Sequence, residues 1–559
     1  MAEEPKRSGV EVTKENSRAL RGTLAEELAR GAEKFGDGDK NLLKFHGSYQ
    51  QEDRDARKAR RGEGLGKYHI LMVRCKIPGG AVTADQWLAL DDLAGKYGNG
   101  TLRITSRQGI QFHGVLMKDL KAHIAAINST LLTTLGACGD VNRNVMSCPA
   151  PVPGVRDEMQ ALASRIAAHL APRTRAYHEI WLDGKPTEKS GHDEEPIYGK
   201  VYLPRKFKIG VALPDDNCVD AYAQDLGLMA KVEGGRIVGY DLLVGGGMGM
   251  THGNDSTFPY LAQPVCHVTP DEAVQAAEAV VRLFRDHGNR ADRKRARIKY
   301  VVHDWGIERF REVFKDYLGR DLTPPAGMPV TGFDLHLGAH PMGEGRWWYG
   351  VSVENGRVKD ENGRRYRTGL RAIVSRFRPS IRLTPMQDML LCGLSSSDIP
   401  LVEAMLDDHG IPRPDKVGRS RQNSMACPAI PTCGLAISEA ERALPPIMDE
   451  LEAKLLQLGL GNEAVGVRMT GCPNGCVRPY QSDIGIVGRS GDKYVVYVGG
   501  RVQGDALNYE LKDLTPRGEI VKTLAPLLEK WKAERQAGEG FGDWCRRIGP
   551  DAARALAGG

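Results

Sequence analysis

The chain repeats part of itself at a fixed separation. The segment TLRITSRQGIQFHGV, residues 101–115, aligns with SIRLTPMQDMLLCGL, residues 380–394, which begins 279 positions later. NVMSCPA, residues 144–150, falls at the same separation on NSMACPA, residues 423–429. Two segments in one register indicate a duplicated unit, and duplicated units commonly pack about a pseudo-twofold axis with a site between them. The sequence therefore predicts two related halves.

Four cysteines lie in two loops of the second half. Cys427 and Cys433 belong to CPAIPTC, and Cys472 and Cys476 belong to CPNGC. Proline and glycine in both loops exclude an uninterrupted helix. Four thiolates suit a structural zinc ion or an iron–sulfur cluster, and the wider first pair favours the cluster because paired zinc ligands usually lie closer in sequence. Buried cysteines without metal are a third interpretation.

The two halves differ at these positions. Cys148 stands at the position of Cys427, but we find no counterpart of the CPNGC loop in the first half, and Met386 replaces Arg107 in the second. We therefore expect one half to hold metal and the other to supply positive charge. The remaining cysteines are interpreted as structural thiols: Cys75, Cys138, Cys148, Cys218, Cys266, Cys392 and Cys545.

Several cations stand on strand-like or turn-like segments among apolar residues. A buried cation without an anionic partner costs several kcal/mol, and few acids lie near these positions in the sequence, Asp140 beside Arg143 being one. Distant carboxylates could pair with each cation, but the set favours a polyanionic cofactor and a small oxyanion, held by arginine forks and by lysines that also donate protons. The set comprises Arg74, Arg103, Arg107, Arg143, Arg205, Lys206 and Lys208.

Composition limits the functional classes. The 559 residues suggest three or four domain-sized units. The polar N-terminal segment lacks the apolar core of a signal peptide, and the chain has no apolar run long enough to span a membrane, so we expect a soluble cytoplasmic protein. Eleven cysteines are too few for a disulfide scaffold. The net charge of +6 is modest, and without a recognition motif we expect no nucleic-acid partner.

Local patterns place a few further elements. We expect a short amphipathic helix within residues 17–36, with Thr23 and Glu26 as a capping box, strands at 69–78 and 101–117, and a helix at 84–97. The charged run 50–64 is typical of a solvated arm, with a docking surface as the alternative.

Two features remain open between a ligand role and a structural one. Gly245, Gly246 and Gly247 in VGGGMGM favour close backbone approach, either to a flat ligand or within a plain turn. His113 is more typical of a hydrogen-bonded core or pocket residue than of a haem ligand.

The two cysteine loops, together with VRCKIPGG, RITSRQGIQFHG, DVNRNVM and YLPRKFK, resemble the sulfite and nitrite reductases that carry sirohaem coupled to a 4Fe-4S cluster. The resemblance covers nearly the whole chain and is greatest to the haemoprotein (beta) subunits of assimilatory sulfite reductases. It implies an α/β fold with two ferredoxin-like half-domains and two cluster-type domains. The implied division is an N-terminal helix and arm at 1–64, half-domains at 65–135 and 321–410, a cluster-type domain without cluster at 136–320, and a cluster- and sirohaem-binding domain at 411–559.

The resemblance also implies roles for particular residues. Cys427, Cys433, Cys472 and Cys476 would hold the cluster, with Cys476 also bridging to the sirohaem iron. The residues implied at the sulfite site are Arg74, Arg143, Lys206 and Lys208. Those implied around sirohaem and its carboxylates are Arg103, Arg107, Gln111, His113, Arg205, Gly245, Gly246, Gly247 and Arg297.

The implied reaction is the six-electron reduction of sulfite to sulfide. Reduction of nitrite to ammonia is the alternative, although nitrite enzymes of the family tend to carry asparagine where this chain has Lys208. A non-catalytic zinc or iron–sulfur protein is a more distant alternative. We find no nicotinamide or flavin site in the sequence, so NADPH is expected to act through a partner flavoprotein, with ferredoxin as the alternative donor.

Overall fold

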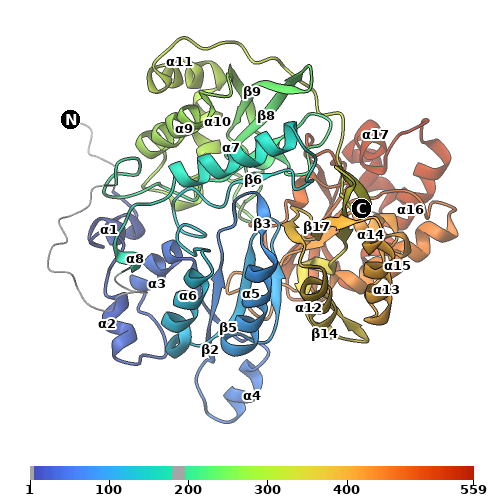
Figure 1. The fold of residues 1–559 in the computed structure, drawn as a ribbon. Coiled ribbons are helices and arrows are strands. Elements are labelled where there is room, and N and C mark those ends of the chain that lie inside the picture. Colours follow the sequence, from blue (N-terminus) through green and yellow to red (C-terminus); the bar gives the residue numbers. More distant parts are fainter. Residues whose placement is uncertain (1–5, 179–194, 559) are drawn as a thin grey trace.

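The computed structural model describes residues 6–178 and 195–558 and contains mixed α/β domains built from related sheets (Figure 1). Two five-stranded sheets are ferredoxin-like and largely antiparallel. The first has the order β1-β2-β5-β4-β13 and the second the order β11-β12-β17-β16-β3. Their strands are β1 Ser48–Glu52, β2 His69–Arg74, β3 Ala81–Val82, β4 Leu102–Ile104, β5 Ile110–Val115, β11 Gly338–Gly343, β12 Arg346–Val351, β13 Arg357–Val358, β16 Ser380–Leu383 and β17 Met389–Ser395.

The two ferredoxin-like sheets exchange a strand. β3 of the first half pairs with β16 of the second, and β13 of the second half pairs with β4 of the first. Each sheet is therefore completed by the other half of the chain, as a pseudo-twofold relation requires. The predicted duplication and fold class are confirmed.

Two further sheets share a second topology. The orders are β6-β7-β8-β9-β10 and β18-β19-β20-β21-β22; in each the first three strands are parallel and the later pairings antiparallel. The strands are β6 Met146–Ser147, β7 Ile209–Ala212, β8 Leu226–Glu233, β9 Arg236–Val244, β10 Gln263–Val268, β18 Ser424–Ala426, β19 Val467–Thr470, β20 Ile484–Ser490, β21 Lys493–Val498 and β22 Tyr509–Pro516.

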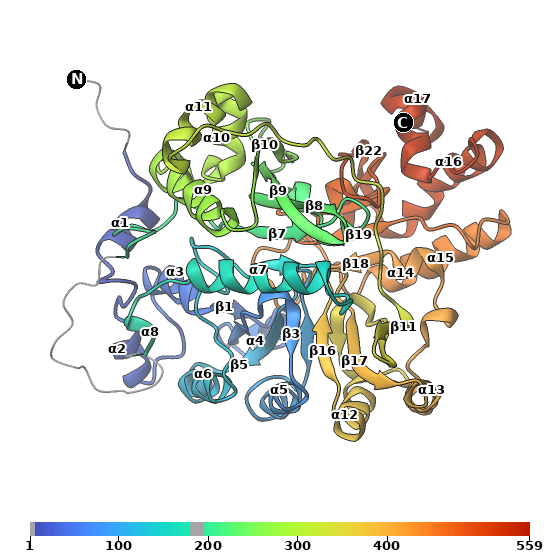
Figure 2. The ribbon, with the colours of Figure 1, turned by 45° about the horizontal axis from the view of Figure 1, so that its top comes forward.

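Helices cover these sheets. α6, α5, α12 and α13 pack side by side along the ferredoxin-like sheets (Figure 2). Thr83 and Gln86 form a capping box that begins α5, as its apolar spacing and cap require. The main helices are α5 Ala84–Tyr97, α6 Leu120–Ser129, α7 Val155–His169, α9 Ala273–His287, α10 Ile298–Trp305, α11 Ile307–Leu318, α12 Tyr366–Phe377, α13 Asp398–Asp408, α15 Leu444–Gln457, α16 Ile520–Glu534 and α17 Phe541–Leu556. No helix in the described residues is long and apolar enough to cross a membrane.

One local prediction was wrong, and a second was confirmed only in part. The strand expected at 101–117 is a hairpin, because Gln108 adopts a left-handed conformation (φ 51°) and its side-chain amide donates to Ser147 O at 2.8 Å and Leu383 O at 3.0 Å. The short helix expected within 17–36 is present as α2, Leu24–Ala29, but without the predicted capping box. Thr23 does not cap it, since its hydroxyl donates to Asp39 instead.

One buried carboxylate links the helices of the two halves. Asp91 on α5 is 2% exposed and accepts from Arg367 Nε at 2.6 Å and Arg371 Nη1 at 2.7 Å, both on α12. Arg367 also donates to Gly100 O at 2.9 Å. A single acid in the first half therefore binds two cations of the second.

Replacing Asp91 should weaken this junction. Asp91→Ala leaves two guanidinium groups without their shared acceptor, and we expect it to lower the free energy of unfolding by about 1–3 kcal/mol. The midpoint of urea unfolding measures the loss. Asp92→Ala is the matched control, because Asp92 is exposed and its one ion pair among the described residues is with Arg371; equal losses in both variants would contradict the account.

Candidate active site

The cysteine loops begin at the ends of two adjacent parallel strands. Cys427 follows β18 and Cys472 follows β19, so strand pairing brings the two loops together. Backbone Gly471 N donates to Cys427 Sγ at 3.4 Å, and the Asn474 amide donates to Cys472 Sγ at 3.4 Å. Cys427 and Cys472 are buried, Cys433 is half-buried and Cys476 is exposed. One of the four thiols therefore remains open at the edge of the group.

The spacing of these sulfurs distinguishes a cluster from a single ion. Burial, followed by the charges of the neighbouring thiolates, raises the pKa of Cys472 to about 11, so the sulfurs lie near one another. Four sulfurs around tetrahedral zinc would lie about 3.8 Å apart. Among the described residues, one set of three or more candidate ligand atoms lies within 4.8 Å of one another, and it does not include these four cysteines. The four cysteine sulfurs are therefore spread more widely than the ligands of a single ion. The wider arrangement fits a multi-iron cluster better than zinc.

A row of polar side chains crosses the first ferredoxin-like sheet. Arg74, Gln111, Arg103 and Arg357 occupy paired positions on β2, β5, β4 and β13. Arg103 alternates with Leu102 and Ile104, so it lies on the face opposite to them. The same row of the second sheet holds Gly350, Leu390, Arg382 and Ala81. Only the first sheet therefore presents a fully polar row.

This row contacts the cluster domain. Arg103 Nη2 donates to Ala426 O at 2.7 Å, immediately before Cys427, and its Nε lies 3.0 Å from Glu441. Arg357 also binds Glu441, at 2.6 Å, and its Nη1 lies 3.1 Å from His113 Nδ1. Burial, then the charge of Arg357, holds the pKa of His113 well below its usual range, so His113 is neutral and accepts.

Three of the cations named from the sequence have acidic partners, which is the alternative of distant carboxylates that the sequence left open. Arg103 binds Glu441, Arg297 binds both oxygens of Asp225 at 2.8 Å, and Arg205 lies 3.9 Å from Asp140. These acids are distant in sequence and are brought in by the fold. The charges of Arg103 and Arg297 are therefore largely compensated within the protein.

Lys206 and Lys208 differ from those arginines. Their ammonium groups make no hydrogen bond or ion pair with any described residue. Burial, then Arg205 and Arg297, lowers the pKa of Lys206 to about 7, while burial, then Lys206 and Arg107, holds that of Lys208 well below its usual range. Cations that repel one another in a buried site require an anion. The group fits a carboxylated macrocycle and an oxyanion.

The remaining predicted cations join the same region. Arg107 donates to Asn144 O at 3.0 Å, and burial followed by the charge of Arg478 lowers its pKa to about 9. Arg74 Nη1 donates to Cys138 Sγ at 3.0 Å, and Arg143 Nε donates to Gly139 O at 2.8 Å. Arg74 and Arg143 both lie within electrostatic range of the Tyr49 phenol. The cations predicted from sequence are therefore gathered around one site.

The glycine loop packs against protein. A Cβ at Gly246 would lie 2.3 Å from Tyr222 O, and one at Gly247 would lie 3.0 Å from Arg297. Lys299 Nζ donates to Gly249 O at 2.7 Å, and Met250 N donates to Pro473 O at 2.9 Å in the CPNGC loop. These glycines therefore allow a tight loop that supports the cysteine loop.

The first half does have a counterpart of the CPNGC loop, contrary to our expectation. β7 and β19 are equivalent strands, and the residues after them, LPDDNCVDAY and GCPNGCVRPY, align without gaps. Cys218 then matches Cys476, and Pro214 replaces Cys472. The other repeated segments are 279 positions apart, whereas these two loops are only 258 apart, so a search at the first separation does not find the match. The CV-x-x-Y pattern that both loops share could have revealed it.

Sequence reasoning also missed several residues of the site. Arg357 enters on the exchanged strand and Glu441 follows the first cysteine loop, so neither is near its partners in sequence. Tyr49 and Lys299 carried no motif. The missed residues are Tyr49, Asp225, Lys299, Arg357, Glu441 and Arg478.

Comparisons with known proteins agree with this architecture. A family model described as the nitrite and sulphite reductase 4Fe-4S domain matches residues 162–322 and 418–558, and one described as the nitrite/sulfite reductase ferredoxin-like half domain matches 64–129 and 340–409. The structure of the Mycobacterium tuberculosis NirA protein has the same fold, with a TM-score of 0.80 at 24% identity, covering 99% of this chain and 98% of that one.

Curated relatives match over almost their whole length. The chain is 43% identical to the NADPH sulfite reductase hemoprotein beta-component of Staphylococcus saprophyticus, over 97% of this chain and 95% of that protein. Identity to the same component of Geobacillus kaustophilus is also 43%, over 97% and 96%. Each of the two family models matches one segment in each half of the duplication. The chain belongs to the nitrite and sulfite reductase family.

Proposed function

We propose that this chain is the haemoprotein subunit of an assimilatory sulfite reductase, which reduces sulfite to sulfide. The observation that carries the proposal is the pair of partnerless lysines, Lys206 and Lys208, near the exposed thiol Cys476. Relatives at 43% identity are named for this activity. Sirohaem and a 4Fe-4S cluster would supply the six electrons one at a time.

Each part of the site has a proposed task. Cys427, Cys433, Cys472 and Cys476 would hold the 4Fe-4S cluster, and Cys476, the exposed thiol, would also bind sirohaem. The cations that line the site would bind the carboxylates of sirohaem. The proposed sirohaem-binding residues are Arg103, Arg107, Gln111, His113, Arg205, Gly245, Gly246, Gly247 and Arg297.

Arg74, Arg143, Lys206 and Lys208 are proposed to bind sulfite. Their positive charges stabilise the dianion, and the lysines donate protons to the oxygens that leave as water. A lysine pKa near neutrality suits this role, because the group gives up a proton and regains it from solvent at working pH. Arginines remain charged throughout and hold the anion in place.

Replacing Lys208 tests this assignment. We expect Lys208→Ala to lower kcat for sulfite reduction by about 10²–10⁴-fold, the usual contribution of a positioned proton donor. Iron and sirohaem contents should stay at wild-type values. Turnover with a chemically reduced viologen dye measures the loss.

The matched control is Lys231→Ala on β8, where the lysine forms a surface ion pair with Glu233. Its turnover should equal that of the wild type. Full sulfite reduction by a cofactor-replete Lys208→Ala enzyme would contradict the proposed role.

Nitrite reduction is the second candidate. Lys206 and Lys208 offer two ammonium groups, which suit dianionic sulfite better than monoanionic nitrite. The ratio of kcat/KM for the two anions decides between the functions, and a value favouring nitrite would replace the proposal.

NADPH is proposed to reach this subunit through a separate flavoprotein, with ferredoxin as the alternative donor. The charged arm offers a docking surface: α4, Arg57–Gly62, has no buried residue and exposes Lys58 and Arg61. The arm touches the first cysteine loop, since Arg54 N donates to Pro431 O at 3.3 Å and Arg54 Nη1 donates to Ala436 O, just after the loop, at 2.7 Å. An acidic partner bound there would lie close to the cluster.

Charge reversal on α4 should therefore weaken electron delivery. We expect Lys58→Glu/Arg61→Glu to raise KM for the protein donor severalfold at low salt, without changing turnover with the viologen dye. Lys530→Glu/Lys532→Glu on α16 is the control. An unchanged KM for both the flavoprotein and ferredoxin would remove α4 as the docking surface.

We also propose the domain division 1–64, 65–135, 136–320, 321–410 and 411–559; residues 1–5, 179–194 and 559 of these ranges lie outside the described residues. The matches at 64–129, 162–322, 340–409 and 418–558 support it. A cytoplasmic location is proposed because cluster thiolates need a reducing compartment.

A further inference from the structure

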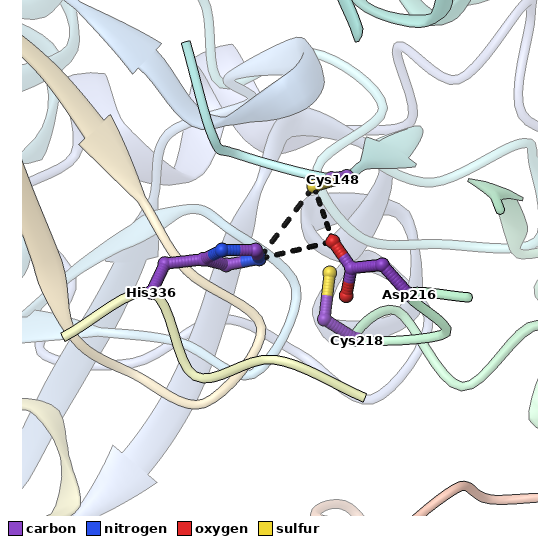
Figure 3. Close-up of side chains that lie close together, drawn as sticks. All are labelled: Cys148, Asp216, Cys218 and His336. Atoms are coloured by element: carbon purple, nitrogen blue, oxygen red, sulfur yellow. Dashed lines mark hydrogen bonds and ion pairs between the residues drawn. The ribbon is translucent and has the colours of Figure 1, made fainter. Parts of the chain in front are cut away.

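The first half contains a second group of metal-binding side chains. Cys148, Asp216, Cys218 and His336 converge, each at most 2% exposed, and their ligand atoms all lie within 4.8 Å of one another (Figure 3). Cys148 Sγ lies 2.9 Å from Asp216 Oδ2 and 3.5 Å from His336 Nε2, and the last two atoms are 3.2 Å apart. The group lies outside the site described above.

Its position is the pseudo-twofold counterpart of the cluster loops. Cys148 matches Cys427 and Cys218 matches Cys476, whereas Gly154 stands in place of Cys433 and Pro214 in place of Cys472. Two thiols of four are therefore retained, too few for the four-thiolate ligation usual for a 4Fe-4S cluster. Asp216 and His336 complete a different donor set at shorter range.

The geometry suits one small ion. Two thiolates, one imidazole and one carboxylate are ligands that zinc takes, and bonds of about 2.0–2.3 Å place neighbouring ligand atoms roughly 3.3–3.8 Å apart in a tetrahedron. The separations of 2.9–3.5 Å among Cys148, Asp216 and His336 need only a small expansion, and Cys218 Sγ lies within 4.8 Å of all three ligand atoms. All four ligands come from protein, as in a structural site.

Surrounding groups orient and balance the ligands. Asp334 Oδ2 lies 3.5 Å from His336 Nδ1, which leaves Nε2 directed at the thiol and carboxylate. Arg156 lies 3.4 Å from Cys148 Sγ and 3.3 Å from Asp216 Oδ2. With both thiols ionised, a divalent ion and the Arg156 guanidinium together cancel the charge of the four ligands.

We propose that Cys148, Asp216, Cys218 and His336 bind one zinc ion. The ion fastens His336, just before β11, to the loops that follow β6 and β7. It thereby holds the connection between the halves in place, at the position where the second half carries its cluster loops. The proposal does not depend on the substrate or electron donor of the enzyme.

Zinc analysis of the intact holoprotein tests the proposal. We expect about one zinc per chain beside full iron and sirohaem, and a zinc-edge X-ray absorption spectrum with two sulfur and two nitrogen or oxygen neighbours. His336→Ala and Cys218→Ser should each lower zinc at least tenfold while the visible spectrum of the cofactors is retained.

The matched control is His267→Ala, because His267 forms a comparable pair with Asp241 at 2.7 Å outside the group of four proposed ligands; it should keep its zinc. If either variant fails to fold, the zinc-edge X-ray absorption spectrum of the wild-type protein still tests the proposal. The proposal is overturned if the holoprotein lacks zinc even after dialysis against zinc, if both variants retain it, or if mass spectrometry finds Cys148 and Cys218 joined as a disulfide.

Discussion

Like charges buried together repel, and this constraint explains the site more directly than any motif. Lys206 and Lys208 have no anionic partner among the described residues, and Arg107 meets mainly backbone and amide oxygens. Burial, followed by the charges of the surrounding cations, lowers the pKa values of these groups, and an anionic ligand would offset this unfavourable free energy. Binding a carboxylated cofactor and then an oxyanion completes the charge balance that the chain alone leaves open.

The duplication gives the chain two copies of each kind of sheet, and substitutions give the two copies different roles. The row Arg74–Gln111–Arg103–Arg357 of the first sheet corresponds to Gly350–Leu390–Arg382–Ala81 on the second. Asp220 and Arg478 occupy equivalent positions after β7 and β19 and bind each other across the halves. An identical pair would repel there, so divergence to opposite charges stabilises the junction.

Sequence reasoning found the features that are local. The duplication, the four thiols and most of the cations follow from short patterns, and the family resemblance is confirmed by the comparisons. It missed features created by long-range pairing. Arg357 reaches the site only because β13 is exchanged between sheets, and Glu441 and Asp225 compensate arginines far away in sequence. The equivalence of Cys218 and Cys476 was hidden by a change of separation between the repeats, which strand order restored.

The central claim is that a thiolate-held cluster lies beside a cation-lined site for a carboxylated macrocycle. Sirohaem extracted from the purified protein, measured together with its iron, tests this most directly. The account predicts one sirohaem and about five irons per chain, four of them in the cluster. A colourless protein whose four cysteines Cys427, Cys433, Cys472 and Cys476 hold a single zinc ion, with no tetrapyrrole, would contradict it.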